Sequence, residues 1–349
     1  MRMILVDKER SKMKKITIKD IAKIAGVTHP TVSRSLNDSN LVSPKTKEKI
    51  KKIADELGFE FNASARRLKT QKTETIAVIF PTNFYHIEAE QFFRMLQKNL
   101  IESVEKNSYN VIFQTAENSF TGESNIKKVI AQNQVDGIII ALNNLKKEDI
   151  EYIKRSKKEC LFLYYKNEID ENSKYFGVDN FYGGYIATKH LIENGGKKIA
   201  TISCDDEISE FYDRTRGYKK ALEEAKIKLE ENLIFNRGIT FESGFDWVSE
   251  NKDIINELDA VFVQTDLMAF GVLQGLKKIG LKVPEDISII GYDDVDYCKY
   301  FSPQLTTIHQ PIEDLVKKAC QELINKLEGK SKKMEGVVLK PYLVKRGSV

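Results

Sequence analysis

The feature that most constrains the fold is a run of short helical segments at the front of the chain, from Ile16 to Gly58. Apolar residues recur there at helical spacing, and Gly26 follows, a residue that tolerates the positive φ at which many helices end. Thr28 and Pro30 supply an N-terminal cap and a first-turn proline for a second helix, which we expect to end near Leu36. Two short helices joined by a tight turn form a helix-turn-helix, whose second helix enters the major groove of DNA.

A third helix is predicted to begin at Ser43 and Pro44, by the same capping argument, and to end at Gly58. The inward residues of the three helices form a small apolar core: Ile18, Ile21, Ala22, Ala25, Val32, Leu36, Ile50, Ile53, Ala54 and Leu57. The second helix keeps an outward face that carries His29, Pro30, Ser33, Arg34 and Asn37. The front of the chain is therefore predicted to be an all-α DNA-binding module.

Charge is distributed unevenly along the chain. The first 72 residues hold 18 Lys and Arg against 8 Asp and Glu, a net charge of +10, whereas the remainder holds 37 against 43, a net charge of −6. A basic front end favours a polyanionic partner, although charge alone is also compatible with a solvated basic surface.

The blocks TIKDIAKIAGVTHPTVSRSLN, VSPKT and NASARRL, in this order and at these separations, closely resemble the lactose-repressor (LacI/GalR) family of bacterial transcription regulators. The resemblance implies that His29 and Pro30 choose the operator sequence, that Arg34 reads a base, and that Ser33 and Asn37 assist. Guanine is the base expected for Arg34, because an arginine reaches both guanine acceptors at once. Pro30 offers apolar contact only, for example to a thymine methyl group.

The resemblance also implies residues that hold phosphates and supply affinity without sequence information. They are Thr17, Lys19, Thr28, Ser43 and Thr46. The alternative for each is a helix cap or a solvated surface position, and we expect Thr28 and Ser43 to serve in both ways.

The segment after the third helix resembles the family's hinge, which forms a short helix on DNA and pairs with its dimer twin in the minor groove. Leu68 matches the apolar wedge that the family inserts between base steps to kink the duplex, the alternative being a linker or core leucine. The residues of this segment expected at the DNA are Asn62, Ala65, Arg66 and Leu68. The chain departs from the family at Phe59, where tyrosine is usual, and at Phe61, where proline is usual.

From Thr75 onward, short apolar strands alternate with amphipathic helices, a pattern that predicts parallel sheets covered by helices on both faces. The expected helices lie at about 84–107, 122–134, 146–157, 180–194, 208–225, 241–250, 266–279 and 311–327. The number of predicted strands is larger than a single sheet usually holds, so we infer two similar α/β lobes with a ligand cleft at their strand ends.

The expected domains are a disordered extension over 1–15, the helix-turn-helix domain over 16–61, a hinge and linker over 62–74, and a two-lobed effector-binding and dimerisation domain over 75–349. The first lobe is assigned about 75–175 and 306–328, and the second about 176–305 and 329–349. The segments RTRGYKKAL, GYDD and LTTIHQP extend the resemblance to the family's regulatory core, which shares the fold of type I periplasmic sugar-binding proteins. The predicted fold class is thus an α-helical headpiece plus a periplasmic-binding-protein-like α/β domain.

Within that core, the resemblance assigns an effector clamp to Arg214 and a ligand-accepting carboxylate to Asp293. Other pocket-lining positions are Tyr85, His86, Asp179, Ile239 and Thr265. Alternatives remain: Asp179 as a helix cap, Arg214 in an interlobe salt bridge, and Tyr85 in simple packing. Ile239 departs from the aromatic residue that many sugar-binding relatives place there, so the effector class stays open among sugars, sugar phosphates and nucleobases.

Two other classes of protein share parts of this pattern. An α/β enzyme finds little support, because the chain has no dinucleotide-binding, phosphate-loop or nucleophile-elbow motif. A secreted solute-binding protein would share the rear fold but would need a signal peptide, for which residues 1–15 are too polar. Cys160, Cys204, Cys298 and Cys320 lack disulfide or zinc spacing. No metal or cofactor is expected.

We therefore predict a cytoplasmic homodimeric repressor that binds a palindromic operator, responds to a small effector and has no membrane partner. A dimer is preferred over a tetramer because no Leu-rich extension follows PYLVKRGSV. The sequence leaves open whether the effector releases the operator or strengthens its binding.

Overall fold

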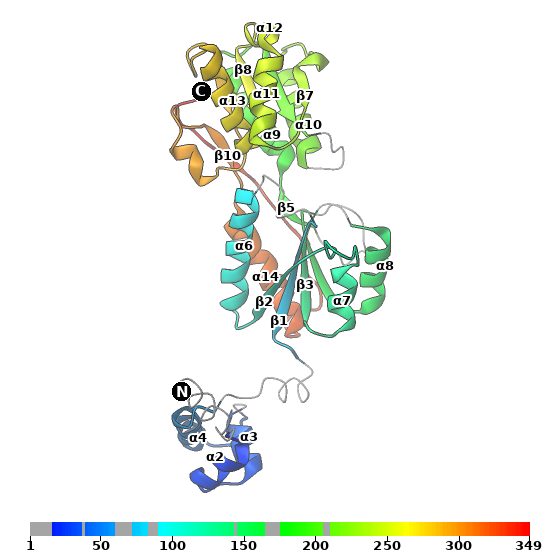
Figure 1. Cartoon of the computed structure of the whole chain (residues 1–349), viewed down its shortest axis with the longest axis vertical. Coiled ribbons are helices and arrows are strands. Elements are labelled where there is room, and N and C mark those ends of the chain that lie inside the picture. Colours follow the sequence, from blue (N-terminus) through cyan, green and yellow to red (C-terminus); the bar gives the residue numbers. More distant parts are fainter. Residues whose placement is uncertain are drawn as a thin grey trace, which may run out of the picture. The chain divides into compact units, whose positions relative to one another are not determined.

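The computed structural model describes residues 16–36, 39–59, 72–82, 90–142, 145–164, 175–204 and 210–349. The chain divides into two compact units, Met1–Lys72 and Thr73–Val349 (Figure 1). Several predicted site residues lie outside the described parts: Asn37, Asn62, Ala65, Arg66, Leu68, Tyr85 and His86. The expected extension over 1–15 and most of the hinge segment also lie outside them.

The first unit contains the three predicted helices, α2 (Ile18–Ala25), α3 (His29–Leu36) and α4 (Pro44–Glu56). Thr17 caps α2 in a reciprocal arrangement with Asp20, and Gly26 ends it in the left-handed conformation with φ 69°. Ser43 caps α4 by accepting a hydrogen bond from the backbone N–H of Thr46. The buried core consists of Ile21, Ala22, Ala25, Val32, Ile50 and Ala54. The helix-turn-helix expectation is thereby confirmed.

The first sheet of the second unit has the strand order β11-β5-β4-β3-β1-β2, with all neighbouring strands parallel. Its strands are β1 (Thr75–Phe80), β2 (Asn110–Thr115), β3 (Gly137–Ala141), β4 (Glu159–Leu163), β5 (Tyr175–Val178) and β11 (Val337–Leu339). Helices α6 and α14 cover one face, and α7 and α8 cover the other (Figure 1). These helices are α6 (Glu90–Glu105), α7 (Asn125–Ala131), α8 (Lys147–Ser156) and α14 (Ile312–Leu327).

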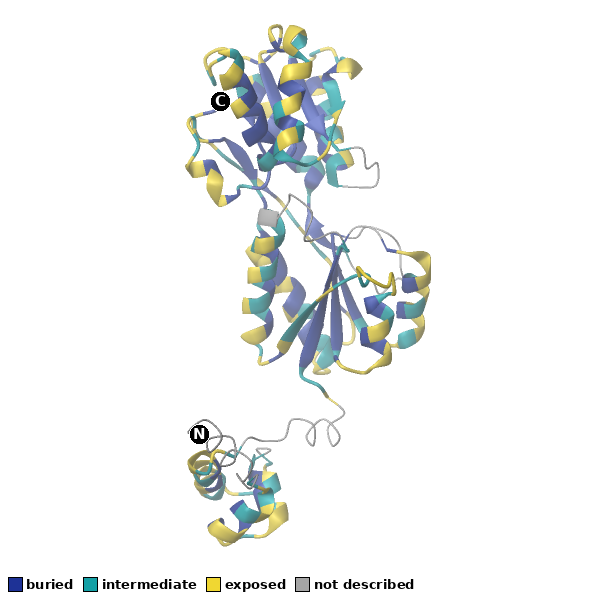
Figure 2. Ribbon diagram, viewed as in Figure 1, coloured by how far each residue is buried: buried dark blue, intermediate teal, exposed yellow. Residues whose placement is uncertain are grey.

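Strand β1 illustrates why the sheet is covered on both sides. Ile76, Val78 and Phe80 belong to the core shared with α6 and α14, whereas Ala77 and Ile79 belong to the core shared with α7 and α8. Successive strand residues point to opposite faces, so an unbroken apolar run needs a helix layer on each. Figure 2 shows buried strands enclosed by helices whose outer sides are exposed.

The second sheet has the order β7-β6-β8-β9, again parallel. Its strands are β6 (Ile199–Ser203), β7 (Ile234–Asn236), β8 (Ala260–Val263) and β9 (Ser288–Ile290). Helices α9 and α10 pack on one face, and α11 and α13 on the other. The helical segments are α9 (Asn180–Glu193), α10 (Glu210–Glu224), α11 (Phe241–Glu250), α12 (Lys252–Ile255), α13 (Asp266–Ile279) and the 3-10 turns η2 (Glu231–Leu233) and η3 (Asp296–Lys299). The predicted two-lobed α/β fold is confirmed.

The predicted lobe boundaries near the C-terminus need correction. Strand β11 pairs with β5 in the first sheet, although 329–349 was assigned to the second lobe. Strand β10 (Thr307–His309) pairs with β12 (Tyr342–Val344), and bridges from Ile290 and Asp293 attach it to the second lobe. The crossings therefore fall between β10 and α14 and between β11 and β12. Strands of three residues are too short to show a period, so no pattern in the chain indicates their partners.

Two helix pairs on the second sheet approach so closely that only glycine fits at the crossing. A Cβ on Gly184 of α9 would lie 2.0 Å from the backbone oxygen of Arg214, and one on Gly217 of α10 would lie 2.1 Å from that of Phe181. The α11–α13 pair repeats this arrangement at Gly244 and Gly271. The reciprocal contacts fix the position of α10, which carries Arg214.

No described helix is long and apolar enough to cross a membrane. All four cysteines are free thiols, and Cys160, Cys298 and Cys320 are buried. Burial raises the pKa of the Cys160 and Cys320 thiols to about 12, as expected of packing residues.

We expect Gly217→Ala to lower the free energy of unfolding of the second unit by roughly 1–3 kcal/mol, because α9 and α10 must separate to admit the methyl group. Urea unfolding followed by fluorescence of Trp247, the only tryptophan of the chain, measures this unit specifically. Gly347→Ala is the matched control, since its Cβ would meet nothing closer than 3.7 Å. Equal midpoints for the two variants would contradict the close-packing argument.

Candidate functional site

The outward face of α3 carries the residues expected to read bases. His29, Pro30 and Arg34 are exposed and Ser33 is half-buried, whereas Val32 is buried against α2 and α4. The sequence did not anticipate that Ser35 is also buried, where its hydroxyl donates to the Thr31 carbonyl oxygen at 2.8 Å. The helix therefore presents its predicted face to solvent.

The residues expected at phosphates gather at the N-terminal ends of helices. Thr17 caps α2, Thr28 precedes α3, and Ser43 caps α4, with Lys19 and Thr46 in the adjoining first turns. Helix N-termini carry free N–H groups and the positive end of the helix dipole, so they favour anions. Two of these hydroxyls also make hydrogen bonds within the chain: Thr28 Oγ1 lies 2.9 Å from Thr31 Oγ1, and Ser43 Oγ lies 2.8 Å from Thr46 Oγ1.

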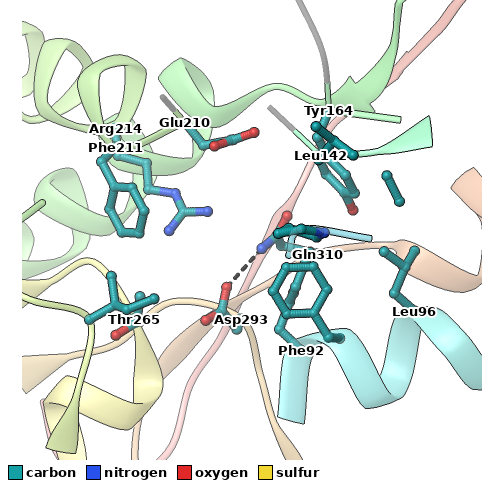
Figure 3. Close-up of a pocket in the computed structure, with 14 residues that line it drawn as sticks. Phe92, Leu96, Leu142, Tyr164, Glu210, Phe211, Arg214, Thr265, Asp293 and Gln310 are labelled. Atoms are coloured by element: carbon teal, nitrogen blue, oxygen red, sulfur yellow. Dashed lines mark hydrogen bonds between the residues drawn. The ribbon is translucent and has the colours of Figure 1, made fainter. Parts of the chain in front are cut away.

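The second unit contains a partly open cavity of about 300 Å³ where strands of both sheets end (Figure 3). Pro81, Leu142 and Tyr164 follow β1, β3 and β4 of the first sheet, while Thr265 and Asp293 follow β8 and β9 of the second. Parallel strands bring their carboxyl ends to one edge, which is where such sheets bind ligands. The lining residues are Pro81, Phe92, Phe93, Leu96, Ala141, Leu142, Tyr164, Glu210, Phe211, Arg214, Ile239, Thr265, Asp293 and Gln310.

Arg214 is held rigidly within this lining. Its Nε donates to Asn180 Oδ1 at 2.9 Å and its Nη1 donates to the Gln264 carbonyl oxygen at 2.5 Å. Its guanidinium carbon lies 3.7 Å from the ring centroid of Tyr292 and 4.9 Å from that of Phe211. A buried guanidinium needs such compensation, and two of its three nitrogens are thereby committed to the protein.

Asp293 faces the cavity from the turn after β9, at a strained φ of 122°. Its Oδ1 accepts a hydrogen bond from Gln310 Nε2 at 2.7 Å (Figure 3). Burial raises the pKa of this carboxyl to about 7, and the nearby Arg214 charge opposes part of the rise. The group thus sits near the point of titration at neutral pH.

Of the other predicted effector residues that the structure describes, two line the cavity and one does not. Ile239 and Thr265 line the cavity, and Thr265 also caps α13 by accepting a hydrogen bond from the Met268 N–H at 3.2 Å. Asp179 is not among the described lining residues. It caps α9, accepting from the Tyr182 N–H at 2.9 Å, so the capping alternative describes its position.

Several lining residues were missed at the sequence level, among them Tyr164, Glu210 and Gln310. Tyr164 comes directly after β4, so the rule that ligands bind at strand ends would have found it. Gln310 lies between β10 and α14, where sequence reasoning misplaced the crossing. Phe92 faces the cavity from α6 through tertiary packing that no local pattern specifies. Among the described residues, no group of three or more His, Cys, Asp and Glu could hold a metal ion.

Comparison with known proteins finds two matching families. The family described as bacterial regulatory proteins, lacI family, matches residues 17–62, and the periplasmic binding protein-like domain matches residues 188–349. The HTH-type transcriptional repressor PurR of Vibrio atlanticus (strain LGP32) is 33% identical over 341 residues, which cover 95% of this chain and 98% of that protein.

Two solved structures are similar over nearly the whole chain. The transcriptional regulator CelR–cellobiose complex is 28% identical, with a TM-score of 0.73, and the similarity covers 96% of this chain and 100% of that one. The lac repressor dimer bound to operator and the anti-inducer ONPF is 25% identical, with a TM-score of 0.78 and coverage of 96% and 99%. These similarities span both units.

The raised pKa of Asp293 predicts a pH-dependent contribution to stability. The folded protein holds this proton up to about pH 7, whereas an unfolded aspartate loses it near its ordinary value of 3.8. The contribution is therefore fully present below pH 4 and is lost as the pH rises to 7, at up to ~1.4 kcal/mol per pH unit. Asp293→Asn cannot titrate, so the unfolding free energy of the wild type minus that of the variant should fall across this window. The unfolding free energies are measured from Trp247 fluorescence at each pH. If the profiles of the wild type and of Asp293→Asn run parallel, the pKa of Asp293 is not raised by folding.

Proposed function

The chain belongs to the lacI family of bacterial regulatory proteins, and from that premise we propose that it is a transcriptional repressor switched by a small effector in the cavity of the second unit. One observation carries the proposal: the chain has both a DNA-reading part and a ligand-binding part. The first unit exposes the α3 face on a complete three-helix core, and the second unit contains a cavity lined by residues from both of its sheets. Members of this family are transcription regulators and not enzymes.

The first unit reads the operator through α3. His29 and Pro30, at the helix start, select the sequence, and Arg34 pairs with a guanine one turn further along. Ser33 and Asn37 assist in base contact. Thr17, Lys19, Thr28, Ser43 and Thr46 hold phosphates around this helix, because free N–H groups at helix N-termini favour anions.

The repressor acts as a homodimer in the cytoplasm, with one α3 in each half of a palindromic operator. The lac repressor structure with which the chain shares its fold is a dimer bound to operator, which supports this assembly. When one α3 of the dimer binds its half-site, the effective concentration of the other α3 at the second half-site rises, so the dimer binds more tightly than either subunit alone. We assign the hinge to residues 62–74, with Asn62, Ala65, Arg66 and Leu68 in the minor groove.

The effector binds between the lobes and alters their closure. It shifts the protein toward one DNA-binding state only through different affinities for the two states. Arg214, Ile239, Thr265 and Asp293 are the predicted effector residues that line the cavity, and Tyr85 and His86 remain proposed contacts. The similar CelR structure contains cellobiose, which supports a sugar as the class of ligand.

Two substitutions test the assigned division between base reading and phosphate holding. Arg34→Ala should relax preference at one operator position and cost ~1–3 kcal/mol on the preferred sequence, because a base contact is lost. Lys19→Ala should weaken binding to all sequences and reduce the salt slope by about 1. The measurement is selection from a random DNA pool, followed by titration at several salt concentrations. Lys52→Ala, an exposed lysine of α4, controls for general charge loss, and equal losses on every sequence for Arg34 and Lys19 would refute the assignment.

A further inference from the structure

Three segments of the chain cross between the lobes of the second unit (Figure 1). The first leads from β5 to α9 at Asp179, the second leads from β10 to α14 at Gln310 and Pro311, and the third leads from β11 to β12 at Lys340 and Pro341. Each crossing joins an element of the first lobe to an element of the second. A change in lobe closure therefore bends all three.

The third crossing is paired with each of the other two. Strand β11 pairs with β5 in the first lobe, and β12 pairs with β10 in the second, where Tyr342 lies opposite His309. Lys340 and Pro341 alone separate β11 from β12. A proline ring fixes φ near its own value, so this short connection has little freedom to bend independently of its neighbours.

The side chain of Lys340 joins the third crossing to the first. Its Nζ lies 5.0 Å from the ring centroid of Tyr182, in the first turn of α9. A cation above an aromatic face is attracted by the ring quadrupole. The backbone adds a second link, because the N–H of Asp179 donates to the Leu339 carbonyl oxygen at 2.9 Å.

The side chain of Tyr342 joins the third crossing to the second. Its ring stacks on the His309 ring, with 4.5 Å between centroids and 28° between planes. The Asp294 carboxylate adds a second link, since Oδ2 lies 2.8 Å from His309 Nδ1 and Oδ1 accepts a hydrogen bond from Arg346 Nη2 at 2.6 Å. Both β10 and the end of β12 are thereby held to the same turn.

These side chains lie at the surface. Lys340 is exposed, Tyr342 is 53% exposed, and Tyr182 and His309 are half-buried. Contacts of such side chains add little to the stability of a core. They can still decide between two arrangements of the lobes, because conformations of one protein commonly differ by only a few kcal/mol.

We propose that Lys340–Tyr342 is the pivot of lobe closure, with Lys340 and Tyr342 as positioning residues that make the three crossings bend together. Rotation of one lobe against the other turns the paired crossings relative to one another, so the contacts with Tyr182 and His309 form in full over one range of closure only. They favour the arrangement of the present structure over the others. The inference rests on the proposed function only in that closure carries the effector signal, because the contacts act with or without an effector.

The test measures interlobe distances in the full-length chain without ligand, by double electron–electron resonance. Spin labels are attached at Lys154→Cys of α8 and Asp253→Cys of α12, both exposed positions, in a Cys204→Ser background where the other three thiols are buried. Dilution with unlabelled chain leaves mainly pairs within one chain. Tyr342→Ala and Lys340→Ala should each raise the ratio of all other separations to that of the present structure about two- to fivefold, the effect of losing one exposed ring or cation–π contact.

Conservative variants separate positioning from a general effect of substitution. Tyr342→Phe keeps the ring and Lys340→Arg keeps a cation above Tyr182, so both should give the wild-type distance distribution. Tyr212→Ala, which removes a 52% exposed tyrosine of α10, and Lys330→Ala, which removes an exposed lysine, should give it too. The urea midpoint from Trp247 fluorescence should stay unchanged in every variant.

Three results would overturn the proposal. They are a wild-type distribution in both alanine variants, an equal change in the conservative variants, and a change that occurs only together with a lower urea midpoint. Operator selection on the wild-type chain is a separate measurement. Its failure would refute the repressor function and leave the distance result standing, since that experiment uses neither operator nor effector.

Discussion

The buried guanidinium of Arg214 is the interaction on which the second unit's cavity depends. It joins α10 to Asn180 at the start of α9 and to Gln264 after β8, and it lies against the ring of Tyr292 after β9. A buried cation is costly unless every side of it is compensated, so these four elements cannot shift independently. The close helix crossing at Gly184 places the backbone of Arg214 itself. The second lobe therefore presents a preformed half of the cavity, with no loop rearrangement needed to orient its cation.

Several cavity residues also hold the fold. Thr265 caps α13, and the Asp293 turn connects through a β-bridge to His309 on β10. The neighbouring Asp294 binds His309 Nδ1 at 2.8 Å and Arg346 Nη2 at 2.6 Å. Ligand contacts are thereby tied to the segment that leads into the interlobe crossing after β10. These bonds join the Asp293 turn to the segment before the interlobe crossing in one contiguous network.

Sequence reasoning succeeded where local chemistry dictates structure. The α3 face followed from the spacing of Val32 and Leu36, and the helix ends followed from Thr17, Gly26 and Ser43. It failed at β11 and β12, because three-residue strands are specified by distant partners and have no period of their own. It also passed over two lining residues: Tyr164, which the rule that ligands bind at strand ends would have found, and Gln310, which lies beside a crossing that only the three-dimensional structure reveals. For Asp179, a cap and a ligand contact demand the same residue type, so sequence alone left both open.

The placement of the cavity explains how a small ligand can control a separate DNA-binding unit. Lining residues come from both sheets, so a ligand makes its full set of contacts only when Tyr164 of the first lobe and Asp293 of the second approach it together. Contacts that exist in only one closure state are the differential affinity that a population shift requires. A ligand with equal affinity for both states shifts nothing, however tightly it binds. Tyr164 and Asp293 line the cavity from different lobes, so a ligand that contacts both makes contacts that a change in lobe closure would alter.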